Sequence, residues 1–512
     1  MNKIFAVLGI SLVVTVIVIV AFANPISDSK DFEILTGTPA DNFSESERDK
    51  FCGVGDAKSN QFVREYKIPT HCTQPQAITT DDQGNVWFAE SNTGRLAKFN
   101  PLTESFTEYN NGLWPKGDNS MIWGLDYING TLWFTDDKHD SVWKFDIATK
   151  RYSQLNLPIL SNTLPQRLQI NDSKLILNDF SGSQIIIIDG FQSNELVTYS
   201  IPSNAKNSVL ADFAMDSKNN LWYTNWIPNG VGILARINQT SFDLSIQNGE
   251  DLLEFERFAL PSDLKTPNGI AVDNNEDIWV ADSSSSHLFK FDISNETFSK
   301  YTTFEATEKT FGNYTGQANS TSSNPYWIEK DSYGRLVFNS PGSNKIGMLY
   351  PETLSIIEYT IPSQNPNWGD CKNPDCGVSQ VFDFTIDGKR IWFSEWAENN
   401  IGMVDTSTAI PIEVELEQKE IILSPGESAI VRFSINSNDD SMEISPIITN
   451  PNPKDLGVKL LPNENQILRN SAMTFEVELM AQNNTVSGDY FVLLGTETDQ
   501  ISVGKFLSVT VN

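Results

Sequence analysis

The sequence predicts an all-β protein: a seven-bladed β-propeller, then a β-sandwich, with a hydrophobic helix at the N-terminus. Three observations lead to this prediction. The segment "PQAITTDDQGNVWFAE" at 75–90 returns as "PNGIAVDNNEDIWVAD" at 267–282 and in five further variants. The repeat stops near residue 411, where shorter alternating strands begin. Residues 4–23 form one apolar run. Because repeats of this length imply a repeat architecture, the propeller is the first element to justify.

Each copy of the repeat predicts a β-hairpin. Apolar and polar residues alternate, a turn of Asp, Asn, Gly or Lys follows, and the alternation resumes. A third and a fourth strand follow, as in "GRLAKFNP" and "SFTEYN" after the first copy. Four strands per unit, at a period of about 40–60 residues, indicate a propeller blade. The seven hairpins end at Glu90, Asp136, Asp179, Asn225, Asp282, Ser340 and Glu395.

The ring is expected to close through its N-terminal strand. Only six fourth strands follow their own blades, and the missing one lies upstream, in "FVREYKIP" at 62–69. Its ending resembles "IIEYTIP" of a complete blade. We therefore predict that this strand completes the last blade of a propeller spanning 61–411 and leaves no open edge.

A large aromatic residue recurs in the second strand of five blades. These residues are Trp87, Trp133, Trp222, Trp279 and Trp392. A ring at this position can pack between neighbouring blades and bury roughly 150–250 Å². The pattern favours a structural role over an aromatic binding platform.

The N-terminus indicates export. Residues 1–23 are interpreted as a signal peptide, with a possible cleavage site at "AFA", or as an uncleaved membrane anchor. A polar tether follows at 24–60. Either alternative places the rest of the chain outside the cytoplasm, and the N-terminal segment is the only expected membrane contact.

Four cysteines support the same compartment. An even number in an exported chain predicts disulfides, here Cys52 with Cys72 and Cys371 with Cys376. A zinc site is the weaker alternative, because neither a C-x-x-C pair nor a His cluster accompanies them.

The formal net charge of −30 argues against nucleic acid as a partner. Simple solubility explains it better than cation binding does, because the charge is spread along the chain. The expected partner is an unidentified small molecule or a cell-surface partner, and a monomer is expected.

The C-terminal region, 412–512, predicts a β-sandwich of immunoglobulin-like type from about seven short alternating strands. "LSPGESAIVRFSI" and "SGDYFVLLGTE" resemble the immunoglobulin-like domains appended to prokaryotic surface proteins and glycosidases. That resemblance implies a spacer or adhesion unit without chemistry. Residues 305–323, between blades five and six, are interpreted as a solvated loop or a lid.

Candidate site residues lie where each inner strand starts and each hairpin ends, because both positions reach the same rim. The predicted ligand-binding rim consists of Gln76, Trp123, Gln166, Arg167, Asn268, Tyr326 and Gln380. The hairpin-end carboxylates Glu90, Asp136, Asp179 and Asp282 could bind Mg²⁺ or Ca²⁺, which prefer oxygen ligands. The alternative is that each carboxylate caps its own loop.

The blade motif "P-x-x-I-x-x-D-x-x-G-x-[IVL]-W-F-x-[ED]", followed by "N-x-I-G", resembles the streptogramin B (virginiamycin B) lyase family. It is also similar to gluconolactonase-like and NHL-repeat propellers. The resemblance spans about 62–411 and implies a seven-bladed propeller that opens a cyclic depsipeptide lactone by elimination, using Mg²⁺ with His and Glu.

Glu395 matches the position of the catalytic Glu of the lyases. The lyases carry His directly after the blade-opening Pro, where this chain has Gln76, Asn268 and Tyr326. A carboxylate or His139, one of three histidines, would have to act as the base.

Two functions follow from these observations. The first is a non-enzymatic extracytoplasmic propeller that binds a ligand or partner at its acidic rim. The second is a divalent-metal-dependent lyase or lactonase acting on a cyclic ester.

Overall fold

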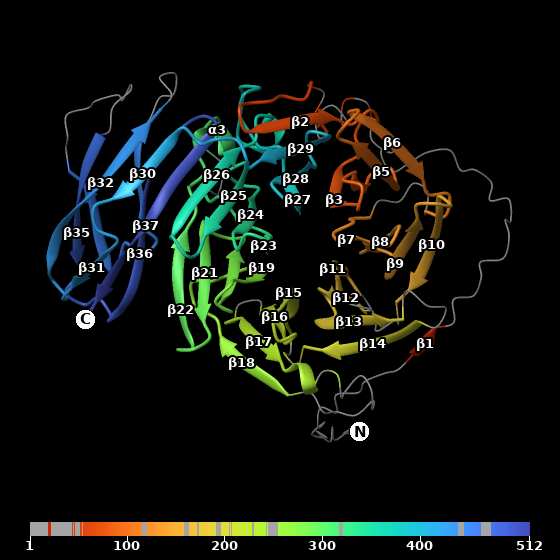
Figure 1. The fold of residues 1–512 in the computed structure, drawn as a ribbon, viewed down its shortest axis with the longest axis horizontal. Helices are drawn as coiled ribbons and strands as arrows, with labels where there is room; N and C mark the ends of the chain where they lie inside the picture. The colour runs from red at the N-terminus through yellow and green to blue at the C-terminus, as the bar shows by residue number, and fades with distance from the viewer. Residues whose placement is uncertain are drawn as a thin grey trace, which may run out of the picture.

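The chain forms a ring of seven antiparallel sheets with a second β-domain against its outer side (Figure 1). In this computed structural model, the described residues are 19–21, 44, 46, 52, 53 and 55–512, with gaps at 115–119, 158–162, 172–173, 191–195, 204, 206, 228–229, 242, 244–253, 317–320, 439–444 and 462–472. The predicted hydrophobic helix lies outside the described residues, except for β1 (Ile19–Ala21), which pairs with a strand of the third blade. Within the described part of the chain, no helix has the length and hydrophobicity needed to span a membrane.

Each blade is a sheet whose strands follow one another from the central channel to the outer edge. The first four blades are β3 (Pro75–Thr80), β4 (Val86–Glu90), β5 (Arg95–Asn100), β6 (Ser105–Asn110); β7 (Leu125–Ile128), β8 (Thr131–Asp136), β9 (Ser141–Asp146), β10 (Arg151–Asn156); β11 (Pro165–Asn171), β12 (Lys174–Asp179), β13 (Gln184–Asp189), β14 (Leu196–Pro202); and β15 (Val209–Met215), β16 (Leu221–Trp226), β17 (Ile233–Ile237), β18 (Phe255–Ala259).

The remaining blades are β19 (Pro267–Val272), β20 (Ile278–Asp282), β21 (His287–Asp292), β22 (Thr297–Thr302); β23 (Ile328–Lys330), β24 (Leu336–Ser340), β25 (Lys345–Tyr350), β26 (Ser355–Thr360); and β27 (Val381–Asp387), β28 (Arg390–Glu395), β29 (Asn400–Asp405) with β2 (Val63–Lys67). A short helix, α3 (Glu308–Phe311), and a 3₁₀ turn, η2 (Pro366–Trp368), lie in the connections before and after blade 6.

The predicted closure of the ring is confirmed. Strand β2 pairs antiparallel with β29, from Val63 opposite Val404 to Lys67 opposite Asn400. The fourth strand of the last blade therefore comes from the N-terminal side of the first blade, which ties the two ends of the ring together.

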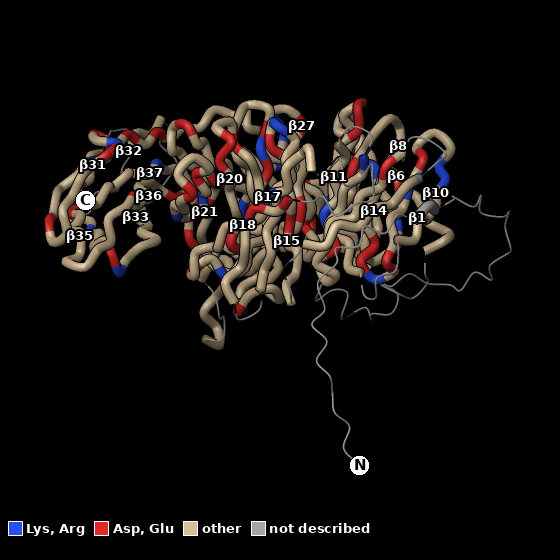
Figure 2. Tube along the Cα trace, turned by 90° about the horizontal axis from the view of Figure 1, so that it is seen from below, with Lys and Arg blue, Asp and Glu red and all other residues tan. Residues whose placement is uncertain are grey.

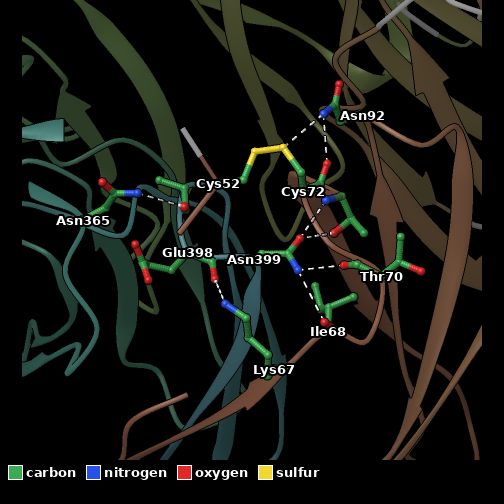
Figure 3. The surroundings of a disulfide bond; sticks show 11 residues. Cys52, Lys67, Ile68, Thr70, Cys72, Asn92, Asn365, Glu398 and Asn399 are labelled. Atoms are coloured by element: carbon green, nitrogen blue, oxygen red, sulfur yellow. Dashed lines mark hydrogen bonds between the residues drawn. A yellow bond between two sulfur atoms is a disulfide. The ribbon is translucent and has the colours of Figure 1, made fainter. Parts of the chain in front are cut away.

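The predicted disulfides are both present, so the zinc alternative is wrong. Cys52–Cys72 fastens the segment before β2 to the start of blade 1 (Figure 3). Beside it, Asn399 of blade 7 donates to the carbonyl of Thr70 (2.8 Å), and Lys67 donates to the carbonyl of Glu398 (2.8 Å). The disulfide thus reinforces the same closure that β2 makes.

The recurrent turn and tryptophan explain why each hairpin forms. Asp81 accepts hydrogen bonds from the Asn85 N–H (2.9 Å) and from Trp87 Nε1 (2.8 Å), and Asp216 with Trp222 and Asp273 with Trp279 repeat the second bond. These indoles are fully buried, and Trp87 contacts Phe145 of the next blade at 5.9 Å between ring centroids. The structural role predicted for the tryptophans is confirmed.

The glycine of "N-x-I-G" has a packing reason. Gly347 and Gly402 lie directly opposite Phe338 and Phe393 of the preceding strand, and a Cβ at either glycine would overlap the facing ring. The glycine of this motif is therefore needed for close packing between two neighbouring strands of one blade.

The C-terminal domain is a sandwich of two sheets. One sheet has the order β30 (Ile412–Leu416), β32 (Ser428–Ser437), β35 (Met473–Ala481), β34 (Leu456–Leu460); the other has the order β33 (Ser445–Thr449), β36 (Gly488–Glu497), β37 (Ile501–Val511), with β31 (Glu420–Leu423) parallel to β37. Buried apolar residues such as Phe433 and Val509 form one core between the sheets. The assignment of this sandwich to the immunoglobulin-like class stays a prediction.

The sandwich is joined to blade 6 by a continuous sheet. Strand β26, the outer strand of that blade, pairs antiparallel with β37, from Ser355 opposite Lys505 to Tyr359 opposite Ile501 (Figure 1). Tyr301 of blade 5 also stacks on Phe491 of β36, with ring centroids 4.3 Å apart. The sandwich therefore covers an edge that the propeller would otherwise leave open.

Acidic and basic residues are interspersed over both domains (Figure 2). This arrangement agrees with the prediction that the negative charge is spread along the chain.

Candidate functional site

The inner strands begin with an irregularity that shapes the channel. Five of them, β3, β11, β15, β19 and β27, shift register near their start, as between Pro75 and Ile78. Such bulges place extra residues against one partner residue and re-aim side chains, and they are common beside functional sites. The paired positions in the bulges are Gln76–Ala77, Gln166–Arg167, Ala211–Asp212, Asn268–Gly269 and Phe382–Asp383.

The register of blade 7 corrects one predicted rim residue. Val381 pairs with Glu395 as Pro75 pairs with Glu90, so Phe382 occupies the position equivalent to Gln76. Gln380 precedes the strand with a φ of 58°, and its carbonyl accepts the N–H of Trp396 (3.0 Å). Gln380 was predicted in place of Phe382 because no proline marks the start of this strand.

Aromatic rings from three blades meet across one end of the channel. Trp123 of blade 2 stacks on Tyr326 of blade 6, with ring centroids 6.3 Å apart, and lies edge-on to Phe382 of blade 7 at 5.8 Å. Phe382 also contacts Trp396, in the loop after β28, at 5.7 Å. These four partly buried residues are called the aromatic layer below.

The polar rim residues support this layer from buried positions. Gln76 is fully buried, and its Oε1 accepts the N–H of Ile122 and the hydroxyl of Ser91, both at 3.0 Å. Gln166 and Asn268 are also buried, and Gly269, next to Asn268, lies against the backbone of Tyr326. The structure thus brings Gln76, Trp123, Asn268 and Tyr326 to one end of the channel.

Arg167 spans the channel next to the aromatic layer, further along the inner strands. Its Nη2 donates to Glu329 of blade 6, its Nη1 donates to Asp383 Oδ1 of blade 7 (3.3 Å), and its Nε lies 3.8 Å from Asp212 Oδ1 of blade 4. The guanidinium also lies over the ring of Trp327, 4.7 Å from its centroid. One cation is therefore shared among three carboxylates.

Burial controls the protonation of this cluster. Loss of hydration raises the pKa of Asp212 and of Asp383 to about 7, although Arg167 acts in the opposite direction. Burial likewise raises the pKa of Asp126 to about 6, and the negative charge of Glu329 adds to that effect. Carboxyls with such values exchange protons near neutral pH, which often marks a functional site.

A cavity of about 300 Å³ adjoins the Arg167 cluster. Arg167, Asp126, Glu329 and Asp383 line it, together with residues further along the inner strands, including Thr79, Gln169 and Thr385. The cavity therefore lies on the opposite side of Arg167 from the aromatic layer.

The hairpin-end carboxylates accept hydrogen bonds from groups of their own blades. Asp179 accepts the N–H groups of Leu164 and Gly182, both at 2.8 Å. Asp282 accepts the N–H of Thr266 (2.9 Å) and the hydroxyl of Ser285 (2.8 Å). Both side chains are fully buried. These contacts correspond to the loop-capping alternative.

The two other predicted metal ligands are also buried. Asp136 accepts from Trp143 Nε1 (3.0 Å) and from Ser120, while Glu90 Oε2 accepts the hydroxyl of Thr93 (2.7 Å). Among the described residues, no group of three or more His, Cys, Asp and Glu could hold a metal ion. The expected convergence of Glu90, Asp136, Asp179 and Asp282 on one site is therefore wrong: each side chain turns into its own hairpin loop.

Comparison with known proteins identifies the family. The sequence profile of the virginiamycin B lyase family matches residues 19–291. The chain belongs to the virginiamycin B lyase family. Solved structures agree on the fold: virginiamycin B lyase from Staphylococcus aureus is 18% identical, with a TM-score of 0.51, over 68% of this chain and 99% of that one. A streptogramin B lyase structure is 17% identical, with a TM-score of 0.50, over 67% and 96%.

A third structure is a catalytically inactive His-to-Ala variant of the S. aureus lyase with quinupristin, at 18% identity and a TM-score of 0.51 over 68% and 99%. No curated protein sequence matches this chain.

The virginiamycin B lyase motif places histidine after the blade-opening residue, and none of those positions holds histidine here. They hold Gln76, Trp123, Gln166, Ala211, Asn268, Tyr326 and Phe382. Glu395, which the family resemblance led us to expect as the catalytic Glu, is fully buried and accepts from Asn400 Nδ2 (3.2 Å). Burial, with the nearby Glu65 carboxyl, raises the pKa of Glu395 well above its usual range.

His139 lies in blade 2, away from the blade 7 contacts of Glu395. Its Nδ1 is 2.8 Å from Asp136 Oδ1, and its side chain is 20% exposed. A carboxylate at Nδ1 fixes the ring orientation and would support a base at the other nitrogen. The structure thus pairs His139 with Asp136 and does not bring it to Glu395.

Sequence reasoning missed five members of the site: Phe382, Trp396, Asp126, Glu329 and Asp383. Phe382 and Asp383 could have been found by aligning "VFDF" with "LADF" of blade 4, which contains Asp212 in the same place. Asp126 and Glu329 carry no such signal: each is the second residue of a short inner strand, β7 or β23, and the sequences around them differ.

Proposed function

We propose that this protein is an extracytoplasmic ligand-binding member of the virginiamycin B lyase family that does not catalyse lactone elimination. The aromatic layer is the observation that carries the proposal. The rings of Trp123, Tyr326 and Phe382 meet across the channel, and Tyr326 stands where the family resemblance led us to expect histidine. The ligand is expected to present an apolar or aromatic face, since aromatic rings gain most from stacked or edge-on contact.

Two buried hydrogen-bond donors at the end of the channel that holds the aromatic layer are available to a ligand. Among the described residues, Gln76 Nε2 and Trp396 Nε1 are buried and have no hydrogen-bond partner. Buried donors are rarely left unpaired, because each costs about 1–3 kcal/mol. Carbonyl groups on a bound molecule would satisfy both.

The lack of a suitable general base at the predicted catalytic position favours ligand binding, and not catalysis, as the function. An elimination requires a group that accepts a proton near working pH. Glu395 is fully buried, and burial raises its pKa well above the usual range, which disfavours the charged form that a base needs. Export of the protein is supported by its two disulfides, which are typical of oxidising compartments.

A second candidate, a lyase or lactonase, is favoured by one observation. The Asp136–His139 pair is a carboxylate-oriented imidazole of the kind that serves as a general base. It lies outside the aromatic layer, so the first proposal is preferred.

Quinupristin, the ligand named for the S. aureus structure, is the probe that tests the proposal. We expect quinupristin to quench tryptophan fluorescence on binding and to be recovered with its ring intact. An elimination that opens a ring leaves molecular mass unchanged, so chromatographic separation of cyclic and linear forms is the readout. Linear product above the protein-free rate would overturn the proposal.

Variants locate the binding site. Phe382→Ala is expected to weaken binding by about tenfold, as for a central aromatic contact. Tyr333→Ala removes an exposed aromatic ring in the hairpin turn of blade 6 and should leave binding unchanged. Equal affinity of both variants would show that the aromatic layer does not bind the ligand.

A further inference from the structure

The cavity beside Arg167 has more negative charge than the protein neutralises. Four carboxyls, those of Asp126, Asp212, Glu329 and Asp383, share a single guanidinium. Unbalanced charge in a confined space is costly, and it is relieved either by protonation or by a bound counter-charge. The charge therefore points to a cationic occupant and opposes an anionic one.

The hydrogen bonds of the cluster leave acceptor capacity open. Asp383 Oδ2 accepts the N–H of Ile78 (3.1 Å), and Asp212 Oδ2 accepts the N–H of Ile270 (3.1 Å). Asp212 Oδ1 faces Arg167, yet among the described residues it has no hydrogen-bond partner, although Asp212 is 1% exposed. Arg167 Nε, 3.8 Å away, is likewise without a partner. This buried carboxyl oxygen is an independent sign that the cluster is incomplete.

Glu329 offers the accessible acceptor. Its Oε1 takes the hydrogen bond from Arg167, and its side chain is 34% exposed toward the cavity that it lines. Asp126 lines the same cavity, with each of its oxygens already accepting one backbone N–H. Since a carboxylate oxygen has two lone pairs, each of these oxygens can accept a second hydrogen bond.

The rest of the lining is mixed, since Thr79, Gln169 and Thr385 line the cavity together with aliphatic and aromatic residues. Ile78, Leu125, Leu168, Ile170 and Phe384 line the cavity beside the carboxyls. A volume of about 300 Å³ is at the lower end of the range for small-molecule pockets. The space therefore suits a small cation.

We propose that this cavity binds a small organic ammonium cation, with its ammonium group against Glu329 and Asp126. A metal ion fits less well, because among the described residues no three His, Cys, Asp or Glu side chains are placed to hold one. The site is separate from the aromatic layer, which lies on the other side of Arg167. It does not depend on the function proposed above.

Calorimetric titration of the full chain with butylammonium chloride tests the proposal, with 1-butanol, butyrate and Ca²⁺ as matched probes. At pH 8 we expect butylammonium to bind and the other three not to bind. Binding should weaken by roughly tenfold or more at pH 5.5, because protons then compete for Asp126, Asp212 and Asp383, while Arg167 stays charged.

Glu329→Gln keeps the shape of the side chain and removes its charge, so binding should fall by at least about tenfold. Glu256→Gln is the control, since Glu256 is also a partly exposed glutamate paired with an arginine, Arg236, but on the outer strand of blade 4. Should Glu329→Gln fail to fold, Asp126→Asn and the pH dependence of the wild type decide. Binding of 1-butanol as strong as that of butylammonium, tighter binding of Ca²⁺, or undiminished binding by a folded Glu329→Gln or Asp126→Asn variant would each overturn the proposal.

Discussion

Lys345 of blade 6 and Glu497 of the sandwich form an ion pair across the junction of the two domains, with Nζ 2.7 Å from Oε1. The ammonium also donates to Ser502 (3.0 Å) and lies 3.7 Å from the buried carboxyl of Glu358. Only 4% of the Lys345 side chain is exposed. Together with the pairing of β26 and β37, this contact makes the sandwich an extension of blade 6 rather than a separate module.

The first prediction concerns this junction. Replacing Lys345 by Met leaves Glu358 buried without its cation, so the free energy of unfolding should fall by about 3–5 kcal/mol, as for other broken buried pairs. Urea denaturation at pH 8 measures the loss. Arg390→Met, which breaks an exposed pair with Asp387, is the control and should cost less than about 1 kcal/mol. Similar losses for the two variants would contradict a buried role for Lys345.

The second prediction compares the two disulfides. The Cys52–Cys72 bond spans 20 residues, and the Cys371–Cys376 bond spans five. A cross-link stabilises mainly by restricting the unfolded chain, so replacing Cys52 and Cys72 by serine should cost about 3 kcal/mol, roughly 1 kcal/mol more than replacing the shorter pair. Thermal unfolding of both double variants gives the comparison. A larger effect of the shorter loop would argue against this ranking.

The blades and their closure could be predicted because their signals are local. Each hairpin carries its own turn acid, its tryptophan and its alternation, so the number of strands can be counted along the chain. Closure by residues 62–69 was predictable because the last blade lacked one strand and its replacement resembled the other fourth strands. The tryptophans were correctly placed in the core for the same reason, since their spacing repeats.

The attachment of the sandwich and the centre of the channel could not be predicted, because they depend on distant parts of the chain. Tyr359 pairs with Ile501, and neither strand differs from an ordinary edge strand in sequence. Arg167 meets Glu329 and Asp383 only after the ring has closed. The hairpin-end carboxylates were wrongly predicted to form one metal site because of a local feature. Each of them caps its own loop, and a single sequence does not distinguish repeated loop capping from a shared set of metal ligands.

The third prediction concerns pH. Burial, with the nearby charge of Glu108, raises the pKa of Glu90 to about 8 from 4.5. Between these values the folded protein holds a proton that the unfolded chain has lost, so the contribution of Glu90 to stability falls as the pH rises. Glu90→Gln should therefore lessen the loss of stability between pH 5 and pH 8. Urea denaturation across that range measures the slope, with the exposed Glu352→Gln as control. A slope unchanged in Glu90→Gln would show that Glu90 titrates normally.

The fourth prediction concerns the turn of the repeat. In blade 1, Asp81 accepts the indole N–H of Trp87, whereas in blade 7 the turn is one residue shorter and, among the described residues, Trp392 Nε1 has no hydrogen-bond partner. Asp81→Ala leaves a buried donor unpaired and removes a bond to the Asn85 N–H, so it should cost about 1–3 kcal/mol.

Asp387→Ala provides the matched comparison, because no indole depends on it in the described structure, and it should cost less than Asp81→Ala. The same order is expected for Asp216 and Asp273, which hold Trp222 and Trp279 as Asp81 holds Trp87. Chemical denaturation of the four alanine variants tests the series. If Asp387→Ala proved as costly as the others, the hydrogen bond to the indole would contribute little, and the aspartate would stabilise the blade through its backbone turn alone.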